Sequence, residues 1–213
     1  MIEKVAVGFA YRTMSPSEFA VRLIRLWAEM SEVQRGGLIY VPYRHWLYEA
    51  RNEMVRDFLS TEAEALLMVD TDMIFEPDDL RRLMSIDAPI AAGAYMFNLE
   101  QLDAAMNIPD IGPTSLLADP LPDEPGEVDF AGTGFMLIKR EVFEAIGEKW
   151  FNHLTIDAPA AEGEDHEGWW LWEDWSFCER ARNAGYKIML DPRTRLGHVK
   201  SLTLTPGRDL EQA

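Results

Sequence analysis

Two acidic residues, Asp70 and Asp72, directly follow the apolar run Ala65–Val69. The run predicts a buried strand, and a strand interior has no use for two neighbouring negative charges. Carboxylate oxygens are the ligands that Mg²⁺ and Mn²⁺ prefer, in a shell that these ions commonly share with substrate phosphates. The alternative is a solvated turn, where Asp is common. The position between an expected buried strand and an expected capped helix favours a metal site.

A second acidic pair, Glu173-Asp174, stands where a helix ending at Gly185 is expected to begin. The helix dipole favours negative charge at this end, and a general base must be ionised. The alternative is that Asp174 is only the N-cap. Four tryptophans surround the pair, more than a cap needs, and they either stack on a sugar ring or belong to the core. They are Trp169, Trp170, Trp172 and Trp175.

Two further side chains suit the same chemistry. His198 would add a neutral nitrogen ligand to the carboxylates, although a lone His is usually not a ligand. An imidazole in the shell favours manganese over magnesium. Arg51 lies on the apolar stripe of a helix expected between Leu47 and Leu59, so its guanidinium needs an acceptor. That acceptor is either a diphosphate, through a bidentate contact, or one of the many acids of the chain, and spacing alone does not decide.

Gly132-Thr133-Gly134 interrupts an expected strand, which indicates a bulge or a close approach of the backbone to a ligand. It is not a phosphate loop, because no Gly-Lys-Ser/Thr follows. Tyr11 and Arg12 come directly after the first expected strand. Their position alone makes them candidates for contact with a nucleobase.

Composition limits the class of protein. The chain has 213 residues, which suits one large domain, and 47% of them are hydrophobic, enough for a full core. The net charge of −17 disfavours nonspecific binding to a phosphate backbone. The single Cys178 excludes a disulfide framework and a Cys-rich zinc site. With neither a secretory signal nor an apolar run of about 20 residues, we expect a soluble cytoplasmic protein that does not bind a membrane.

Strand and helix signals alternate in the first half of the chain. The strands are expected at Val5–Phe9, Leu38–Val41, Ala65–Val69 and Pro89–Tyr95. The first helix has a capping box at Ser15-Pro16-Ser17-Glu18 and is expected to run past Val33 until Gly36-Gly37 stops it. A second helix spans Leu47–Leu59, and a third opens at Glu76-Pro77. This order predicts an α/β fold with a mostly parallel central sheet and helices on both faces. Ligands of such sheets lie beyond the carboxyl ends of the strands, where Asp70 and Asp72 are expected.

The second half is less regular. A long loop is expected over Asn98–Glu127 and a mobile acidic lid over Asp157–Gly168. A strand is expected over Val128–Lys139, a short helix over Glu141–Ile146 and a last strand over Tyr186–Leu190. We expect a single domain over residues 1–213, with a nucleotide-binding half at 1–97, an acceptor-binding half at 98–200 and a tail at 201–213.

These pieces, in this order, resemble the GT-A fold glycosyltransferases, most closely those of the family 2 type. The resemblance runs from Val5 to about His198. It is carried by the first strand Val5–Phe9, Ala50-Arg51-Asn52, Met68-Val69-Asp70-Thr71-Asp72, Gly132-Thr133-Gly134-Phe135-Met136, Glu173-Asp174 and Gly197-His198.

The resemblance implies a role for each motif. Asp72 would bind Mn²⁺ or Mg²⁺, with Asp70 near the ribose or the ion, and His198 would complete the metal site. Asp174 would be the catalytic base of an inverting displacement. The remaining residues divide between two sites. Tyr11, Arg12, Arg51, Asn52 and Thr71 would bind the nucleotide sugar, and Gly134, Trp172 and Glu173 would border the acceptor. The acids are thus expected to converge with the imidazole around one pocket.

The sequence therefore predicts a metal-dependent glycosyltransferase that moves a sugar from a nucleotide diphosphate sugar to an acceptor hydroxyl. The acceptor is a saccharide or, because small relatives resemble phage enzymes, a hydroxymethylated base in DNA; the cytoplasm would then be that of the host. The net charge disfavours duplex DNA, although a flipped base needs only a small contact patch. One alternative is a nucleotidyltransferase, which is expected to carry a basic Gly-rich loop that Phe9–Thr13 lacks. The other is a noncatalytic carbohydrate-binding module that uses the tryptophans.

Overall fold

A seven-stranded sheet forms the centre of the protein. The computed structural model describes residues 2–12, 17–43, 45–95, 123–156, 169–194 and 196–199. The order of the strands across the sheet is β2-β1-β3-β7-β5-β10-β6. Their bounds are β1 Val5–Tyr11, β2 Arg35–Pro42, β3 Ala65–Val69, β5 Ile90–Gly93, β6 Gly126–Val128, β7 Phe135–Lys139 and β10 Ile188–Asp191. Two small sheets pair β4 Met73–Ile74 with β11 Gly197–His198, and β8 Leu154–Ile156 with β9 Trp169–Leu171.

Five of the seven strands run in one direction. β1 is parallel to β2 and β3, and β5 is parallel to β10, while β7 lies antiparallel between β3 and β5 and β6 lies antiparallel to β10. The carboxyl ends of β1, β2, β3, β5 and β10 therefore meet at one edge. The predicted mostly parallel sheet is confirmed. The insertion of β7 from the second half of the chain is not something that the order of elements predicts.

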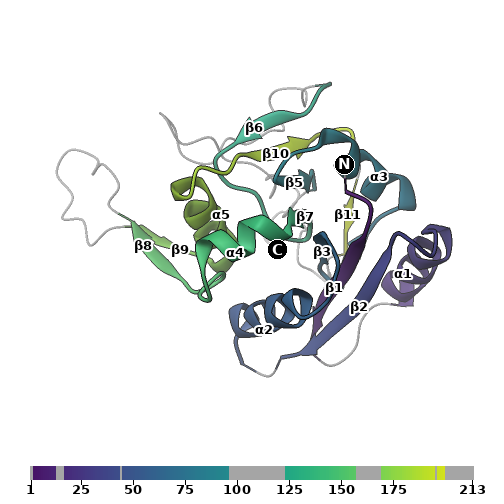
Figure 1. Cartoon of the computed structure of the whole chain (residues 1–213), viewed down its shortest axis with the longest axis horizontal. Coiled ribbons are helices and arrows are strands. Elements are labelled where there is room, and N and C mark those ends of the chain that lie inside the picture. Colours follow the sequence, from purple (N-terminus) through teal and green to yellow (C-terminus); the bar gives the residue numbers. More distant parts are fainter. Residues whose placement is uncertain are drawn as a thin grey trace, which may run out of the picture.

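Helices cover both faces of the sheet, as predicted (Figure 1). They are α1 Ser17–Glu29, α2 Leu47–Leu59, α3 Pro77–Ile86, α4 Arg140–Ile146 and α5 Glu173–Asn183. Because side chains alternate along a strand, Leu66 and Met68 of β3 pack toward α2, α4 and α5, and Leu67 packs toward α1 and α3. All five residues of β3 are buried, which explains its uninterrupted apolar sequence.

The first helix is shorter than expected. α1 ends at Glu29, and Val33 lies outside it and is exposed. Gly36 and Gly37 do not stop the helix but belong to β2, where the register with β1 shifts by one residue. A Cβ at Gly36 would lie 2.7 Å from Ala63 Cβ, so a glycine allows the strand to bulge against its neighbours. Of the predicted capping box, residues 15 and 16 lie outside the described residues.

The other boundaries agree with the expected elements more closely. α2 and β3 have the expected bounds, and α5 begins one residue earlier and ends two residues earlier than expected. The strand expected over Val128–Lys139 is wrong in its middle, because β6 ends at Val128 and β7 starts at Phe135, with a turn at Thr133-Gly134 between them. The loop expected over Asn98–Glu127 is wrong at its end, because Gly126 and Glu127 belong to β6. Its part up to residue 122, the lid over 157–168 and the tail from residue 201 lie outside the described residues. In the part of the chain that the structure describes, no helix combines the length and the apolar character that crossing a bilayer requires.

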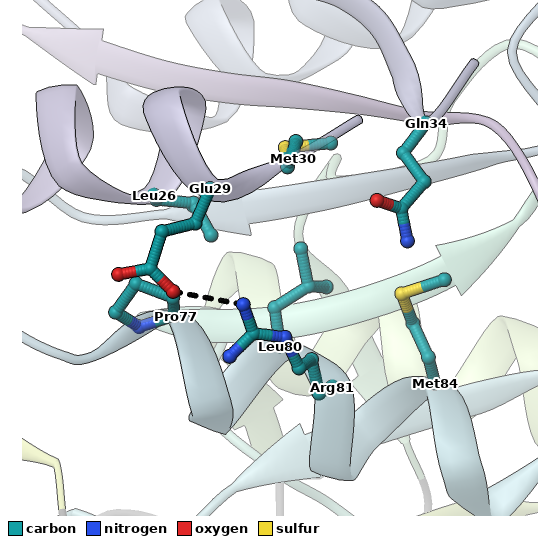
Figure 2. Close-up of a pocket in the computed structure, with 8 residues that line it drawn as sticks. All are labelled: Leu26, Glu29, Met30, Gln34, Pro77, Leu80, Arg81 and Met84. Carbon is teal, nitrogen blue, oxygen red and sulfur yellow. Dashed lines mark hydrogen bonds and ion pairs between the residues drawn. The ribbon is translucent and has the colours of Figure 1, made fainter. Parts of the chain in front are cut away.

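A shallow groove separates α1 from α3 (Figure 2). Leu26 of α1 and Met30, the residue that follows α1, face Leu80 and Met84 of α3 across it. Glu29 and Arg81 form an ion pair of 2.8 Å between the two helices. None of the predicted site residues lines this groove, so it serves the packing of the two helices.

The start of α3 contains a buried carboxylate. Glu76 is the N-cap, and its backbone N–H donates to Asp79 Oδ2 at 2.8 Å in a capping box. Burial raises the pKa of Asp79 from its ordinary value of 3.8 to about 6, with Arg82 opposing and Asp78 and Asp191 adding to the increase. Between about pH 4 and about pH 6, the Asp79 carboxyl therefore keeps a proton in the folded protein that it loses in the unfolded chain.

Replacement of Asp79 by Asn tests this linkage. Since the folded pKa is raised, the stability of the parent falls as the pH rises from about 4 through about 6. The amide still accepts the bond from Glu76 but cannot ionise. We expect the gain in unfolding free energy of Asp79→Asn to be on the order of 2 kcal/mol larger at about pH 8 than at about pH 4.5, measured by urea unfolding. Asp57→Asn, at an exposed position on α2, is the control, and an equal gain of Asp79→Asn at both pH values would contradict the assignment.

Candidate functional site

A buried arginine joins the two acidic motifs at the carboxyl edge of the sheet. Arg51 lies on α2 among its core residues and is 3% exposed. Its Nη2 donates to both carboxylate oxygens of Asp70 at 3.0 and 3.2 Å, and its Nη1 donates to Glu173 Oε1 at 2.8 Å. Burial alone would lower the pKa of Arg51, but Asp70, Glu173 and Asp174 together raise it above its ordinary value. Of the two acceptors that the sequence left open for Arg51, the structure shows the acids of the chain.

Asp72 and His198 meet although 126 residues separate them. His198 Nε2 lies 3.0 Å from Asp72 Oδ2. The pairing of β11 with β4 brings them together, because His198 stands opposite Met73, and the N–H of Val199 donates to the carbonyl of Asp72 at 2.8 Å. The imidazole is largely buried, and the carboxylate is partly open to solvent. The predicted convergence of these two side chains is thus present.

Tyr95, which was not among the predicted site residues, connects Asp70 with His198. The backbone N–H of Asp70 donates to the Gly134 carbonyl at 2.9 Å, and the N–H of Gly134 donates to Tyr95 Oη at 3.1 Å. The Tyr95 ring also contacts His198 edge to face, with 5.5 Å between the ring centroids. A Cβ at Gly134 would lie 2.8 Å from Tyr95 Cζ, so the ring requires a glycine there. The only sequence signal for Tyr95 is its place just after an apolar strand.

Glu173 and Asp174 lie inside the first turn of α5 and not at its N-cap position. The N-cap is Trp172, and α5 begins at Glu173, so Asp174 is not the cap. Asp174 Oδ1 accepts from the backbone N–H of Trp175 at 2.8 Å. Trp172 is 62% exposed, whereas the Trp175 ring packs 5.5 Å from Phe130. The tryptophans therefore divide between surface and core; the side chain of Trp169 lies outside the described part of the structure.

Four predicted site residues remain: Asn52, Tyr11, Arg12 and Thr71. Each either makes contacts within the protein or is at least partly exposed to solvent. Asn52 is buried, and its amide oxygen accepts from the N–H of Phe151 at 2.9 Å while its amide nitrogen donates to Asn152 at 2.8 Å. Tyr11, at the end of β1, packs near Tyr40 with 6.5 Å between ring centroids. Arg12 is exposed, and Thr71 is half-buried in the turn between β3 and β4.

A divalent cation held by protein side chains alone needs several oxygen or nitrogen donors. Among the described residues no group of three or more His, Cys, Asp or Glu side chains is arranged to hold a metal ion. Asp72 and His198 offer one oxygen and one nitrogen. One further polar group, the hydroxyl of Thr133, is buried and has no hydrogen-bond partner in the described part of the chain. Among the described residues, Asp72 and His198 thus offer two ligands for an ion rather than a complete cage.

Comparison with known proteins identifies the fold. No family model matches the chain, and no curated protein matches its sequence. Among solved structures, the chain is similar to A197 from STIV, with a TM-score of 0.58 and 14% identity over 93% of this chain and 86% of that one. It is also similar to GalNAc-T7, in a structure with UDP, GalNAc and Mn²⁺, with a TM-score of 0.57 and 13% identity over 98% of this chain. The chain spans 45% of the length of GalNAc-T7. These likenesses show that the fold is of the GT-A type, as predicted.

We expect the buried ion pairs of Arg51 with Asp70 and Glu173 to contribute to the stability of the protein. Arg51→Met keeps an apolar stem in α2 but leaves Asp70 and Glu173 without their shared cation. Breaking one side of a buried ion pair costs on the order of 3–5 kcal/mol. We expect a loss of this size in urea unfolding at neutral pH, and a partial recovery in Arg51→Met/Glu173→Gln.

The matched control is Arg81→Met, because Arg81 also contacts two acids but does so at the surface. Surface ion pairs contribute about 0–1 kcal/mol. A loss in Arg51→Met that is no larger than the loss in Arg81→Met would contradict the importance of the buried network.

Proposed function

We propose that this chain is a metal-dependent glycosyltransferase that moves a sugar from a nucleotide diphosphate sugar to an acceptor hydroxyl. The observation that carries the proposal is the meeting of Asp72 with His198 beside the Arg51-linked pair of Asp70 and Glu173. The carboxyl edge of an α/β sheet is the usual place for a ligand. The presence of UDP, GalNAc and Mn²⁺ in the GalNAc-T7 structure supports this class of donor and ion.

Asp72 and His198 are the residues that would hold the ion. Mn²⁺ accepts both carboxylate oxygen and imidazole nitrogen, and Mg²⁺ accepts the oxygen more readily than the nitrogen. A ligating Nε2 must be deprotonated, so the hydrogen bond between the two side chains would be exchanged for two bonds to the ion. Two protein ligands leave positions for phosphate oxygens and water, which is typical of ions that bind together with a nucleotide. When bound, the ion supplies positive charge that stabilises the leaving diphosphate.

The other residues of the edge divide between positioning and contact with the donor. Because Arg51 is buried and already bonded to two acids, we assign it a positioning role: it orients Asp70 and Glu173. Asp70 and Thr71 lie at the tip of β3 and would face the ribose. Tyr11 and Arg12 follow β1 at the same edge and would contact the nucleobase.

For Asn52, which the resemblance implied as a nucleotide-sugar contact, we propose instead a positioning role on the acceptor side. Its two bonds fix the chain at Phe151 and Asn152, which precede β8. Gly134 is required by the Tyr95 ring, and Glu173 is held by Arg51. We therefore take the exposed Trp172 as the acceptor contact among the residues implied by the resemblance.

Asp174 is the proposed general base. It lies in the first turn of α5, where the helix dipole stabilises an anion. The attacking hydroxyl would give its proton to the Asp174 carboxylate as its oxygen bonds to the anomeric carbon and the bond from that carbon to the diphosphate breaks. One base and one stabilised leaving group suffice for a single displacement, which inverts the anomeric centre. A base of this kind contributes about 10²–10⁴-fold to the rate.

Asp72→Ala tests the ion site. A donor that binds only the folded protein raises its melting temperature. We expect UDP-GalNAc with Mn²⁺ to stabilise the parent more than UDP-GalNAc with EDTA, in a thermal-shift panel that also contains UDP-glucose and GDP-mannose. Asp72→Ala should lose the Mn²⁺-dependent part of the shift, while the exposed Asp78→Ala should keep it. An unchanged Mn²⁺ dependence in Asp72→Ala would place the ion elsewhere.

Asp174→Asn tests the base separately from binding. The amide has nearly the shape of the carboxylate but cannot accept the proton. We expect transfer to fall at least about 10²-fold while the affinity for the donor stays within about threefold of the parent. Glu62→Gln, at an exposed position remote in sequence, is the control for the loss of one negative charge. An equal loss of affinity and turnover would show that Asp174 is structural.

A further inference from the structure

Five aromatic rings form a continuous series on the surface beside α5, which we call the aromatic platform. In order, the ring centroids of Trp46, Tyr48, His153, Trp170 and Trp172 lie 6.5, 5.2, 4.3 and 4.8 Å apart. The rings come from the start of α2, the approach to β8, and β9 with the residue that follows it. Trp46 and Tyr48 carry no local sequence signal that links them to the acidic pair, because they lie more than a hundred residues before it.

The platform is held in place by the backbone beneath it. Leu171 is buried between Trp170 and Trp172, so strand alternation directs the two tryptophans to the opposite, outer side. His153 Nδ1 donates to the Leu171 carbonyl at 3.1 Å, which fixes the plane of the ring that stacks on Trp170. Ser176 Oγ ties the same region together, because it donates to the Leu171 carbonyl and accepts from the N–H of Leu154.

The rings are not buried by this packing. Trp46, Trp170 and Trp172 are 60%, 51% and 62% exposed, although each contacts another ring. A cluster that served only to fill the core would cover its rings. Clustered exposed apolar side chains commonly mark a binding surface. Trp172 is also the N-cap of α5, two residues before Asp174, so the platform begins at the proposed base.

We infer that the aromatic platform binds a neutral oligosaccharide and leads one of its hydroxyls to Asp174. This deepens the proposed function, on which the transfer step rests, by naming the acceptor class. Pyranose rings present apolar C–H faces that stack on aromatic planes and polar edges that stay in water, which suits rings that are half exposed. Several successive rings suit a ligand of several sugar units.

The charge of the protein argues against a single-stranded nucleic acid as the ligand of the aromatic platform. Single-stranded nucleic acids also stack on such series, but their binding sites combine the rings with a positively charged groove. This chain has a net charge of −17, and the exposed acid Glu49 directly follows Tyr48. A neutral ligand avoids that repulsion.

The test is direct binding without donor or metal. Cellohexaose, chitohexaose, maltohexaose and the oligonucleotide dT12 are titrated into the full chain in EDTA, with tryptophan fluorescence and calorimetry as readouts. We expect at least one hexasaccharide to bind, and Trp170→Ala and Trp172→Ala each to weaken it about tenfold. Trp172→Phe should keep most of the affinity, which separates loss of a ring from misfolding.

Tyr40→Ala is the matched control, because Tyr40 is 63% exposed on β2, outside the platform. Its affinity for the hexasaccharide should stay within about twofold of the parent. Absence of binding to all three hexasaccharides, binding that the tryptophan substitutions leave unchanged, or ring-dependent binding to dT12 alone would overturn the inference. Ring-dependent saccharide binding in a chain that transfers no sugar would support the platform and contradict the proposed function.

Discussion

The burial of one guanidinium determines how the edge of the sheet is arranged. Arg51 is almost completely removed from water, and an uncompensated charge in such a place is strongly destabilising. Only arginine offers donors in two directions from a rigid plane, so a single side chain binds Asp70 on one side and Glu173 on the other. The tip of β3 and the first turn of α5 are thus held next to each other by the protein alone. The residues that flank these acids, Asp72 and Asp174, take their positions from that arrangement.

The antiparallel strand β7 supplies the second half of the arrangement. Because β7 runs against β3, its first residue Phe135 pairs with the last residue of β3, Val69. The turn before β7 therefore reaches the same edge as the tips of the parallel strands, and Gly134 binds the backbone of Asp70. Tyr95, after the end of β5, then fits beneath Gly134. A parallel β7 would have placed this turn at the opposite edge, away from the acids.

The sequence predicted the helices and strands that depend on local signals and part of the site. Its predictions were wrong or incomplete for residues whose roles depend on partners far away in the sequence. The bounds of α2 and β3 follow from an apolar stripe and an apolar run, which are local signals. The meeting of Asp72 with His198 was expected only through the resemblance, because the pairing of β4 with β11 that produces it joins residues 126 positions apart. The prediction that Gly36-Gly37 ends the first helix was wrong, because a glycine that ends a helix and one that forms a bulge have the same sequence signal. The acceptors of Arg51 are 19 and 122 residues away, so spacing left its partner open. Tyr95 was missed because its role depends on β7.

The charges at the edge explain why a cation belongs to the proposed reaction. Asp70, Asp72, Glu173 and Asp174 bring four carboxylates to this region, and Arg51 offsets only part of their charge. A diphosphate adds further negative charge, and repulsion between like charges is strong where water is partly excluded. A divalent cation held by Asp72 would reverse the sign of that interaction for the donor. A neutral saccharide on the aromatic platform is not subject to the repulsion and needs no ion. On the proposed function, the two substrates would therefore differ in their metal dependence: donor binding would require the ion, whereas acceptor binding would not.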